Sequence, residues 1–357
     1  MNENNSNKAI DWNNLSFQAI TTKSIFLAKC NDGEKWNNGN LVPYGDLELP
    51  PTAGVLNYGQ GVFEGMKAYR TTRNKVVLFR PDMNQKRLKL SSQRLCIPEV
   101  DEELFFKAVK QTVIDNHEFI PPFGKGSLYI RPISLGTGAT LGLRNAPSYT
   151  FMVYVSPVGN YFKGSKIPCI SVEITHEFHR ASSKGVGSAK TIGNYASSLY
   201  PLNLAKSKGF DEVMYLNAEN ESLIDELGSA NIFIIKDNIL KTPKLTGAIL
   251  QGVTRDSVIQ IAKEILKMDV EETEISISDV LSADEVFCTG TAVVISPIGK
   301  ITNNGTTTKI TDEIGPTSLK LRKILTDIQL QKIEDPFGWI YPIEINWCPK
   351  LKTPPED

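Results

Sequence analysis

A lysine and a glutamate in the second half of the chain are the residues whose types and spacing best suit chemistry. Lys190 lies in the segment S-A-K-T-I-G-N-Y, and Glu226 follows 36 positions later, just before an apolar run. A lysine amine can hold a carbonyl cofactor as a Schiff base, and a carboxylate can keep a pyridine nitrogen protonated so that the ring draws electrons from a substrate carbon. The pair therefore fits an enzyme that uses pyridoxal phosphate.

Each of these residues also has a purely structural interpretation. Lys190 is alternatively a surface lysine, Tyr195 a core residue, and Glu226 part of a surface turn. The position of Lys190, in a short turn between a strand and a helix, favours a functional role because rigid scaffolds present functional groups there. Glu226 lies in a mostly apolar neighbourhood, where a carboxylate needs a cationic partner such as a pyridinium. On these residues alone both interpretations stay open.

Length and composition describe a globular protein of two domains. The chain has 357 residues, of which 41% are hydrophobic and 22% charged, with a formal net charge of -1. This charge gives no indication of nucleic acid or an anionic membrane as a partner, and no apolar run approaches the roughly 18 residues of a membrane helix. Five scattered cysteines form no zinc or CxxC spacing, and the first residues show no signal or transit pattern. We expect a cytoplasmic protein without a metal site; an atypical mitochondrial address stays open.

Apolar runs of strand length alternate with amphipathic segments, which predicts a mixed α/β fold. A break rich in Gly, Asn, Lys and Ser separates two halves. We predict a small N-terminal domain over residues 1–157, a linker over 158–168, a large domain over 169–341 and a tail over 342–357. Pro201 is expected to kink a helix that runs from the lysine turn to Gly209. The other expected strands and helices are Val76–Arg80, Ser127–Pro132, Tyr149–Ser156, Cys169–Thr175, Glu212–Leu216 and Asn231–Ile235 (strands), and Asp101–Phe119, Ser257–Leu266 and Ser318–Gln331 (helices).

Two further segments have features of a phosphate site. L-Q-G-V-T-R-D-S precedes an apolar pattern of helical spacing, so the amides of Val253 and Thr254 are expected at a helix start, where anions bind. T-G-T-A, residues 289–292, has a glycine that lets the backbone approach a ligand. Arg80 is either a further phosphate ligand or an arginine at a helix start beside Pro81. Ordinary helix capping would also account for G-V-T.

Eight segments, in order along the chain, are more specific than any single motif. They are GQGVFEGMKAYR, LFRP, GSLYIRP, VSPVGNYF, KTIGNY, DELGSANIF, GVTR and DEVFCTGTA. Together they closely resemble the branched-chain amino acid aminotransferases of the fold-type IV group of pyridoxal phosphate enzymes, and among these the plant-like members. The resemblance spans about Asp11 to Tyr341. It implies a homodimer of two-domain α/β subunits that bind pyridoxal 5'-phosphate in the cleft between a small and a large domain.

The resemblance also implies a role for each matching residue. Lys190 corresponds to the lysine that bonds to the cofactor and then acts as general base, and Glu226 to the carboxylate on the pyridine nitrogen. Arg131 corresponds to the arginine that binds the distal carboxylate of glutamate. The other implied cofactor residues are Arg80, Tyr195, Ser229, Leu250, Val253, Thr254, Gly290 and Thr291. The other implied substrate residues, which form an aromatic pocket and a turn that binds the α-carboxylate, are Tyr58, Phe63, Tyr129, Tyr161, Thr291 and Ala292.

The implied activity is a reversible, ping-pong transfer of an amino group between L-leucine, L-isoleucine or L-valine and 2-oxoglutarate. Two alternatives stay open. One is another fold-type IV activity, such as a D-amino acid aminotransferase or an aminodeoxychorismate lyase, against which Y-I-R-P and G-V-F-E-G argue. The other is a non-catalytic protein that keeps the fold.

The chain departs from the family at two places. Val293 and Ser296 stand where some animal members carry a redox-active CxxC pair, which excludes a thiol switch there. Gln251 replaces a proline that is common in the phosphate turn. Because backbone amides do not need that proline, we expect phosphate binding to be retained.

Overall fold

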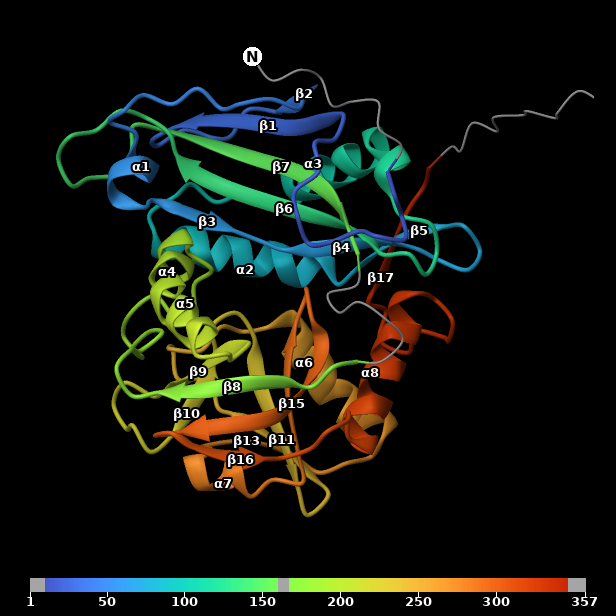
Figure 1. Cartoon of the computed structure of the whole chain (residues 1–357). Helices are drawn as coiled ribbons and strands as arrows, with labels where there is room; N and C mark the ends of the chain where they lie inside the picture. The colour runs from blue at the N-terminus through green and yellow to red at the C-terminus, as the bar shows by residue number, and fades with distance from the viewer. Residues whose placement is uncertain (1–9, 160–166, 346–357) are drawn as a thin grey trace, which may run out of the picture.

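Two β-sheets make up most of the protein, whose computed structural model describes residues 10–159 and 167–345 (Figure 1). The first sheet has eight strands, paired antiparallel in the order β17-β5-β4-β6-β7-β1-β2, with β3 beside β6. Its strands are β1 (Ser24–Asn31), β2 (Asn40–Pro43), β3 (Gly61–Phe63), β4 (Met66–Arg70), β5 (Val76–Phe79), β6 (Ser127–Gly136), β7 (Ser148–Val158) and β17 (Ile340–Ile343).

The second sheet has nine strands and mixes parallel with antiparallel pairs. Their order is β10-β9-β8-β15-β14-β11-β12-β13, with β16 beside β15. Parallel pairs occur where β8 meets β9 and β15, and where β12 meets β13. The strands are β8 (Ile170–Thr175), β9 (Glu212–Leu216), β10 (Ile224–Leu227), β11 (Asn231–Lys236), β12 (Ile239–Pro243), β13 (Val270–Thr273), β14 (Glu285–Gly290), β15 (Val294–Asn303) and β16 (Thr306–Lys309).

Helices pack on both sheets, and α3 shows how local sequence sets their ends. The side chain of Asp101 accepts a hydrogen bond from the amide of Leu104, which caps the first turn. The buried face of α3 then packs in the same core as the inner face of the first sheet. The helices are α1 (Gly54–Tyr58), α2 (Pro81–Arg94), α3 (Glu102–Asp115), η1 (His117–Phe119), α4 (Ile192–Ser197), α5 (Leu199–Ser207), α6 (Val253–Gln260), η2 (Ile261–Ile265, a π-helical stretch), α7 (Ile277–Leu281) and α8 (Pro316–Gln329).

The mixed α/β fold is confirmed, and most differences from the predicted elements lie at element ends. The helix predicted after the lysine turn is two helices, α4 and α5, which meet at Ser198. Pro201 lies in the first turn of α5 instead of at the break, because the amides of a first turn have no intrahelical partner to lose. The helix predicted from Ser257 begins four residues earlier, at Val253, because Gly252 already has the extended conformation of an N-cap.

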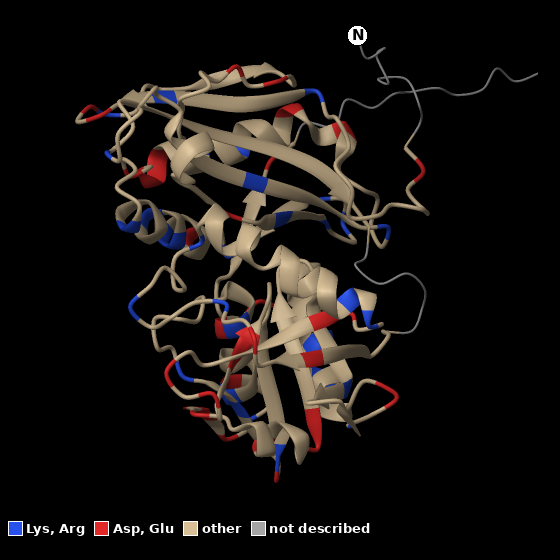
Figure 2. Cartoon of the chain, turned by 60° about the vertical axis from the view of Figure 1, so that its left-hand side comes forward, with Lys and Arg blue, Asp and Glu red and all other residues tan. Residues whose placement is uncertain are grey.

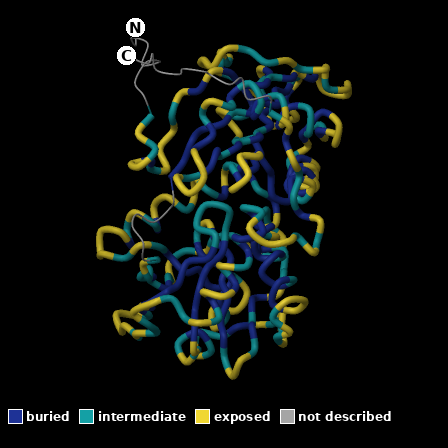
Figure 3. The backbone as a smooth tube through the Cα atoms, turned by 90° about the vertical axis from the view of Figure 1, so that its right-hand side faces the viewer, coloured by how far each residue is buried: buried dark blue, intermediate teal, exposed yellow. Residues whose placement is uncertain are grey.

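A shared hydrophobic core joins the two halves of the protein. In β5, Val77 and Phe79 point to the side opposite Val76 and Leu78, so both faces of this strand are buried. Val77 and Phe79 pack in one cluster with α6, α8 and Phe287 of the second sheet. Figure 3 shows buried segments running through the inside of both halves. Because this cluster contains residues from both sheets, it fixes their relative position.

The chain returns to the first sheet near its C-terminal end. β17 pairs with β5, which places Ile340 opposite Phe79 and Ile343 opposite Val76. Pro342 and Ile343, which we predicted as the start of a tail, therefore belong to a strand. Residues 160–166 of the predicted linker and residues 346–357 of the predicted tail lie outside the described residues. The domain boundaries stay a prediction.

The surface mixes both signs of charge. Figure 2 shows basic and acidic residues interspersed along the ribbon of both halves, consistent with the formal net charge of -1. None of the helices in residues 10–159 and 167–345 combines the length and apolar character needed to cross a membrane. In the same ranges, no group of three or more His, Cys, Asp or Glu side chains is arranged to hold a metal ion.

Candidate active site

A cavity of about 510 Å³ receives side chains from both halves of the protein. The structure places Arg80 and Tyr58 away from its walls, and Tyr161 lies outside the described residues. The predicted cofactor and substrate residues that line it are Phe63, Tyr129, Arg131, Lys190, Tyr195, Glu226, Ser229, Leu250, Val253, Thr254, Gly290, Thr291 and Ala292.

Lys190 is held in place through its backbone, with its amine in the cavity. Its amide donates to Ser91 Oγ at 2.9 Å, and its carbonyl accepts from the amide of Phe63 at 3.0 Å. Nζ lies 2.6 Å from the hydroxyl of Tyr195. Burial, reinforced by the cation of Arg87, lowers the pKa of Lys190 to about 8. The uncharged amine, which a nucleophile or base requires, is therefore far more populated near neutral pH than in an exposed lysine.

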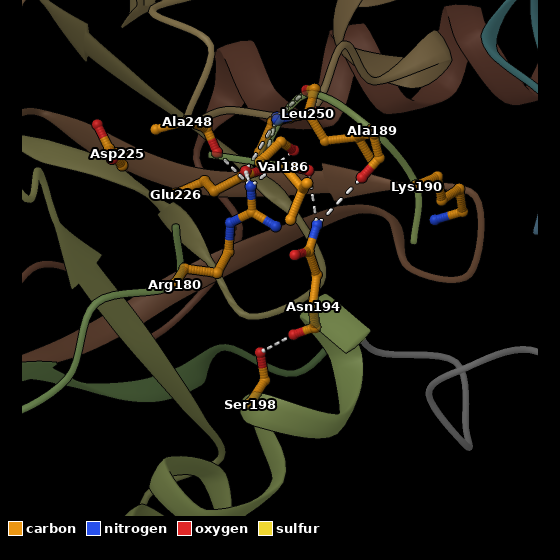
Figure 4. Close-up of polar contacts among 12 residues, drawn as sticks. Arg180, Val186, Ala189, Lys190, Asn194, Ser198, Asp225, Glu226, Ala248 and Leu250 are labelled. Carbon is orange, nitrogen blue, oxygen red and sulfur yellow. Dashed lines mark hydrogen bonds and ion pairs between the residues drawn. The ribbon is translucent and has the colours of Figure 1, made fainter. Parts of the chain in front are cut away.

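Hydrogen bonds also brace the segment before the lysine (Figure 4). The side-chain amide of Asn194 donates to the carbonyls of Val186 and Ala189, at 2.9 and 3.0 Å. Thr191 caps α4 by accepting from the amide of Asn194. The lysine thus lies between a braced loop and a capped helix, which limits its backbone movement.

Glu226 is a buried carboxylate with several partners. Its Oε1 lies 2.7 Å from Arg180 Nη2 and accepts from the amide of Leu250 at 2.9 Å. Its Oε2 accepts from Asn231 Nδ2 at 3.0 Å. Burial raises the pKa of Glu226 to about 7, and the Arg180 cation opposes this shift. A further cation in the cavity would stabilise the charged form.

Arg180 was not predicted as a site residue, although it lines the cavity. Besides Glu226, it donates to the carbonyl of Gly187 at 3.0 Å and to the carbonyl of Ala248. Figure 4 shows Arg180 between Glu226 and the loop that leads to Lys190. It therefore connects the two residues whose spacing first indicated a cofactor site. No local pattern around H-R-A predicts this role.

Arg80 makes structural contacts outside the cavity. Its guanidinium lies 2.6 Å from Asp256 Oδ2 and donates to Ser257 Oγ at 2.8 Å. Its backbone is the N-cap of α2, with a φ of 49°, directly before Pro81. Of the two interpretations left open by the sequence, its position favours the helix-start arginine, which here ties α2 to α6. Its predicted contact with a phosphate stays a prediction.

Arg87, two turns farther along α2, lines the cavity, whereas Arg80 does not. Nε and Nη2 donate to Glu64 at 2.7 and 2.8 Å, while Nη1 donates to the carbonyl of Gln251 at 2.9 Å. Glu64 is completely buried, and its ion pair and hydrogen bonds, mainly with Arg87, outweigh burial and hold its pKa below the usual value. This carboxylate orients Arg87 beside the start of α6. Both residues belong to matching segments or lie close to them, yet neither was predicted.

The start of α6 has the features of an anion site, with no competing side-chain cap. Gly252 is the N-cap and no side chain caps it, so the first amides of the helix are available to a ligand. Val253 and Thr254 line the cavity at this point. A Cβ on Gly252 would lie 2.0 Å from Asn231 Oδ1, so a larger residue would displace the side chain that donates to Glu226. Together with Arg87, these amides form a donor set suited to a phosphate.

Another part of the cavity wall consists of aromatic side chains and one arginine, Arg131. Arg131 Nη2 donates to Tyr129 Oη at 3.0 Å, and its guanidinium lies 4.6 Å from the ring centre of Phe63. Its buried Nε has no hydrogen-bond partner among the described residues. A Cβ on Gly65 would lie 2.1 Å from Tyr129 Oη, which explains this glycine. Phe17, which was not predicted, also lines the cavity. The wall is mainly apolar but retains one unused cationic donor.

Comparison with known proteins connects this geometry to one family. The family described as "Amino-transferase class IV" matches residues 61–301. The "Branched-chain amino acid aminotransferase 2, chloroplastic" of Humulus lupulus is 47% identical over 92% of this chain and 81% of its own. The "Branched-chain amino acid aminotransferase 1, mitochondrial" of the same organism is 44% identical over 94% of this chain and 85% of its own. The solved branched-chain amino acid aminotransferase of Escherichia coli is 27% identical, with a TM-score of 0.78 over 90% of this chain and 100% of that one.

We predict that Arg180→Met lowers the free energy of unfolding of the apoprotein by about 3–5 kcal/mol, because it leaves a buried carboxylate without its cation. Urea titration at pH 8 measures the free energy of unfolding. This pH lies above the Glu226 pKa of about 7, so the carboxylate is charged in wild type. The loss should be smaller at pH 5.5, where Glu226 is largely protonated. Arg180→Met combined with Glu226→Gln should recover most of the loss; an equal loss in the double variant contradicts the ion-pair explanation.

Proposed function

This chain belongs to the class IV aminotransferases, and within them to the plant-type branched-chain amino acid aminotransferases, and on that basis we propose its reaction. It transfers an amino group reversibly between L-leucine, L-isoleucine or L-valine and 2-oxoglutarate, with pyridoxal 5'-phosphate as cofactor. One observation carries the proposal: the Lys190 amine, the buried Glu226 carboxylate and the uncapped start of α6 line a single cavity.

The residues present fit the three polar parts of this cofactor. Lys190 supplies the amine for its carbonyl carbon, and Glu226 supplies an anion for its pyridine nitrogen. Arg87 and the amides at the start of α6 supply donors for its phosphate. Thr289 Oγ1, on the cavity wall, is buried without a hydrogen-bond partner among the described residues. When bound, the cofactor supplies a ring that withdraws electrons from the α-carbon of the substrate.

Each polar side chain of the cavity has a separate role in the proposed proton transfer. Lys190, with its lowered pKa, would remove the proton from the substrate α-carbon, hold it on Nζ and deliver it to the cofactor carbon that takes up the amino group. Tyr195, 2.6 Å away, orients that amine. Glu226, fixed by Arg180, holds a negative charge at the opposite side. The proposed ligands of the α-carboxylate are the backbone amides of Thr291 and Ala292.

The aromatic wall explains how one pocket accepts two kinds of side chain. Phe63 and Tyr129 offer apolar surface to a branched aliphatic chain. Arg131 offers a charge to the distal carboxylate of glutamate or 2-oxoglutarate. When leucine is bound, the Tyr129 hydroxyl still accepts a hydrogen bond from the guanidinium, and the rings of Phe63 and Tyr129 stabilise its charge.

We predict that the purified protein shows a visible band from its bound cofactor, which bleaches with L-leucine and returns with 2-oxoglutarate. Lys190→Ala should lose both the band and turnover, whereas the exposed neighbour change Lys184→Ala should keep both. Absorption spectra and a coupled glutamate assay measure these outcomes. An active, yellow Lys190→Ala protein would refute the assignment. A wild-type band that bleaches with D-alanine but not with L-leucine would instead indicate a D-amino acid aminotransferase.

We predict that Arg131→Ala raises KM for 2-oxoglutarate and glutamate about 10- to 100-fold, the range expected for losing a charged hydrogen-bond donor. KM for leucine should change by less than about threefold, because its side chain makes no polar contact there. Steady-state kinetics with each substrate measures the difference. Arg131→Lys, which keeps a charge, is the matched control and should lie between wild type and Arg131→Ala. An equal loss for all substrates contradicts the role of Arg131 in specificity.

We propose that the protein is a homodimer. Tyr58, an implied substrate residue, lies away from the cavity of its own chain, where its hydroxyl donates to the carbonyl of Leu141. Beside it, Leu141 and Leu143 are 83% and 86% exposed. We name these three residues with Leu56 the apolar patch. Burying it against a second copy would remove this apolar surface from water and bring Tyr58 near the cavity of the partner.

We predict that Leu141→Ser combined with Leu143→Ser weakens the dimer, because it removes most of the apolar patch. Light scattering after size exclusion should give about twice the 39.5 kDa chain mass for wild type and a shift toward one mass for the variant. Leu319→Ser, an exposed leucine on α8, is the control and should leave the mass unchanged. A monomeric wild type with full activity contradicts the proposal.

We propose the cytoplasm as the location of the protein. Four cysteines in the described residues are free thiols, in keeping with a reducing compartment. Microscopy of a fluorescent fusion tests this, and accumulation in an organelle would refute it.

A further inference from the structure

The turn between β14 and β15 carries two of the implied substrate residues, Thr291 and Ala292, on the cavity wall. Gly290 pairs with Val294, which leaves three residues to form the turn. Val294 has a φ of 62°, a left-handed conformation that is unfavourable for a β-branched residue. Local preference therefore does not account for the shape of this turn, and tertiary contacts must maintain it.

Arg322 on α8 holds the strained side of the turn. Its Nη1 donates to the carbonyl of Val293 at 3.0 Å and to the carbonyl of Ile295. These carbonyls flank Val294, so one guanidinium fixes the backbone on both sides of the strained residue. Arg322 does not line the cavity and reaches the turn from outside it.

Lys67 on β4 holds the cavity side of the same turn. Its Nζ donates to the carbonyl of Ala292 at 3.2 Å, and the residue is only 7% exposed. Ala292 lines the cavity but Lys67 does not, so this carbonyl is directed to a group outside the cavity wall. Burial, together with the neighbouring Arg322 cation, lowers the pKa of Lys67 to about 7. No carboxylate in the described residues forms an ion pair with this amine, so its burial costs stability.

We propose that Lys67 is a positioning residue for the α-carboxylate of the substrate, acting through the turn at Ala292. This inference rests on the proposed function, because it takes an amino acid or 2-oxo acid as the ligand. A carbonyl oxygen turned toward the cavity would repel a carboxylate, and the hydrogen bond from Lys67 keeps it away. The same bond fixes the peptide planes of the turn, so that its amides stay available. The Arg322 guanidinium behind the turn adds a positive charge that further stabilises the bound anion.

The test uses the holoenzyme with two ligands that separate the carboxylate from the amine. 4-Methylpentanoate has a carboxylate and no amine, and 3-methylbutylamine has an amine and no carboxylate. Both are titrated by their effect on the cofactor absorbance. Lys67→Met should raise Kd for 4-methylpentanoate, and KM for both leucine and 2-oxoglutarate, about tenfold. Kd for 3-methylbutylamine and kcat should stay within about twofold of wild type, a split that a general structural defect does not produce.

Matched variants complete the experiment. Lys67→Arg keeps the charge and should restore most of the carboxylate affinity, while Lys75→Met, at an exposed lysine just before β5, should behave as wild type. If Lys67→Met does not fold, Lys67→Gln decides the question, since it is uncharged and too short to replace the amine. Equal losses for acid and amine, or no loss, would overturn the inference. A wild type that responds to neither leucine nor 4-methylpentanoate would instead overturn the proposed function.

Discussion

The buried ion pair between Arg180 and Glu226 is the contact on which the cavity depends. Their side chains are 6% and 4% exposed, so each charge requires the other. Glu226 belongs to β10, whereas Arg180 lies in the loop that ends at Lys190, so the pair fixes that loop to the second sheet. Arg180 also holds the carbonyls of Gly187 and Ala248. One guanidinium thus sets both the charge of the carboxylate and the path of the lysine segment.

A second constraint is that the cavity needs both halves of the protein. The second half supplies Lys190, Glu226 and the start of α6, while the first supplies the aromatic wall and Arg87. The cluster that joins β5 to α6, α8 and the second sheet keeps these parts in register. β17 adds a further connection, because it follows α8 in the chain but pairs with β5. The rigidity of the site therefore comes from packing outside it.

Positive charge dominates the described part of the cavity wall, where four cationic side chains face one carboxylate. Glu64, behind the wall, orients Arg87 rather than facing the ligand. Such an excess suits ligands that bring a phosphate and one or two carboxylates. It also lowers the pKa of Lys190, since Arg87 and Arg131 both oppose a charged amine. The cations that we propose as ligand-binding groups thus add to burial in favouring the uncharged form of the lysine.

The sequence by itself determined the parts of this protein that depend on neighbours in the chain. Apolar periodicity predicted β5 to β9, β11 and the helices α3, α6 and α8, but not the strands β1 to β4 or the helix α2. The lysine–glutamate spacing and the family resemblance indicated Lys190, Tyr195, Glu226 and the start of α6, all of which line the cavity. Tertiary structure decided which arginine faces it: Arg80 and Arg87 are seven residues apart, and only the packing of α2 turns Arg87 inward. The contacts that support the site could not be predicted from the sequence either, because they join residues far apart in the chain. Lys67 and Ala292, for example, are 225 positions apart. Chain proximity sets local conformation, but a buried charge is placed by partners that only the folded chain brings together.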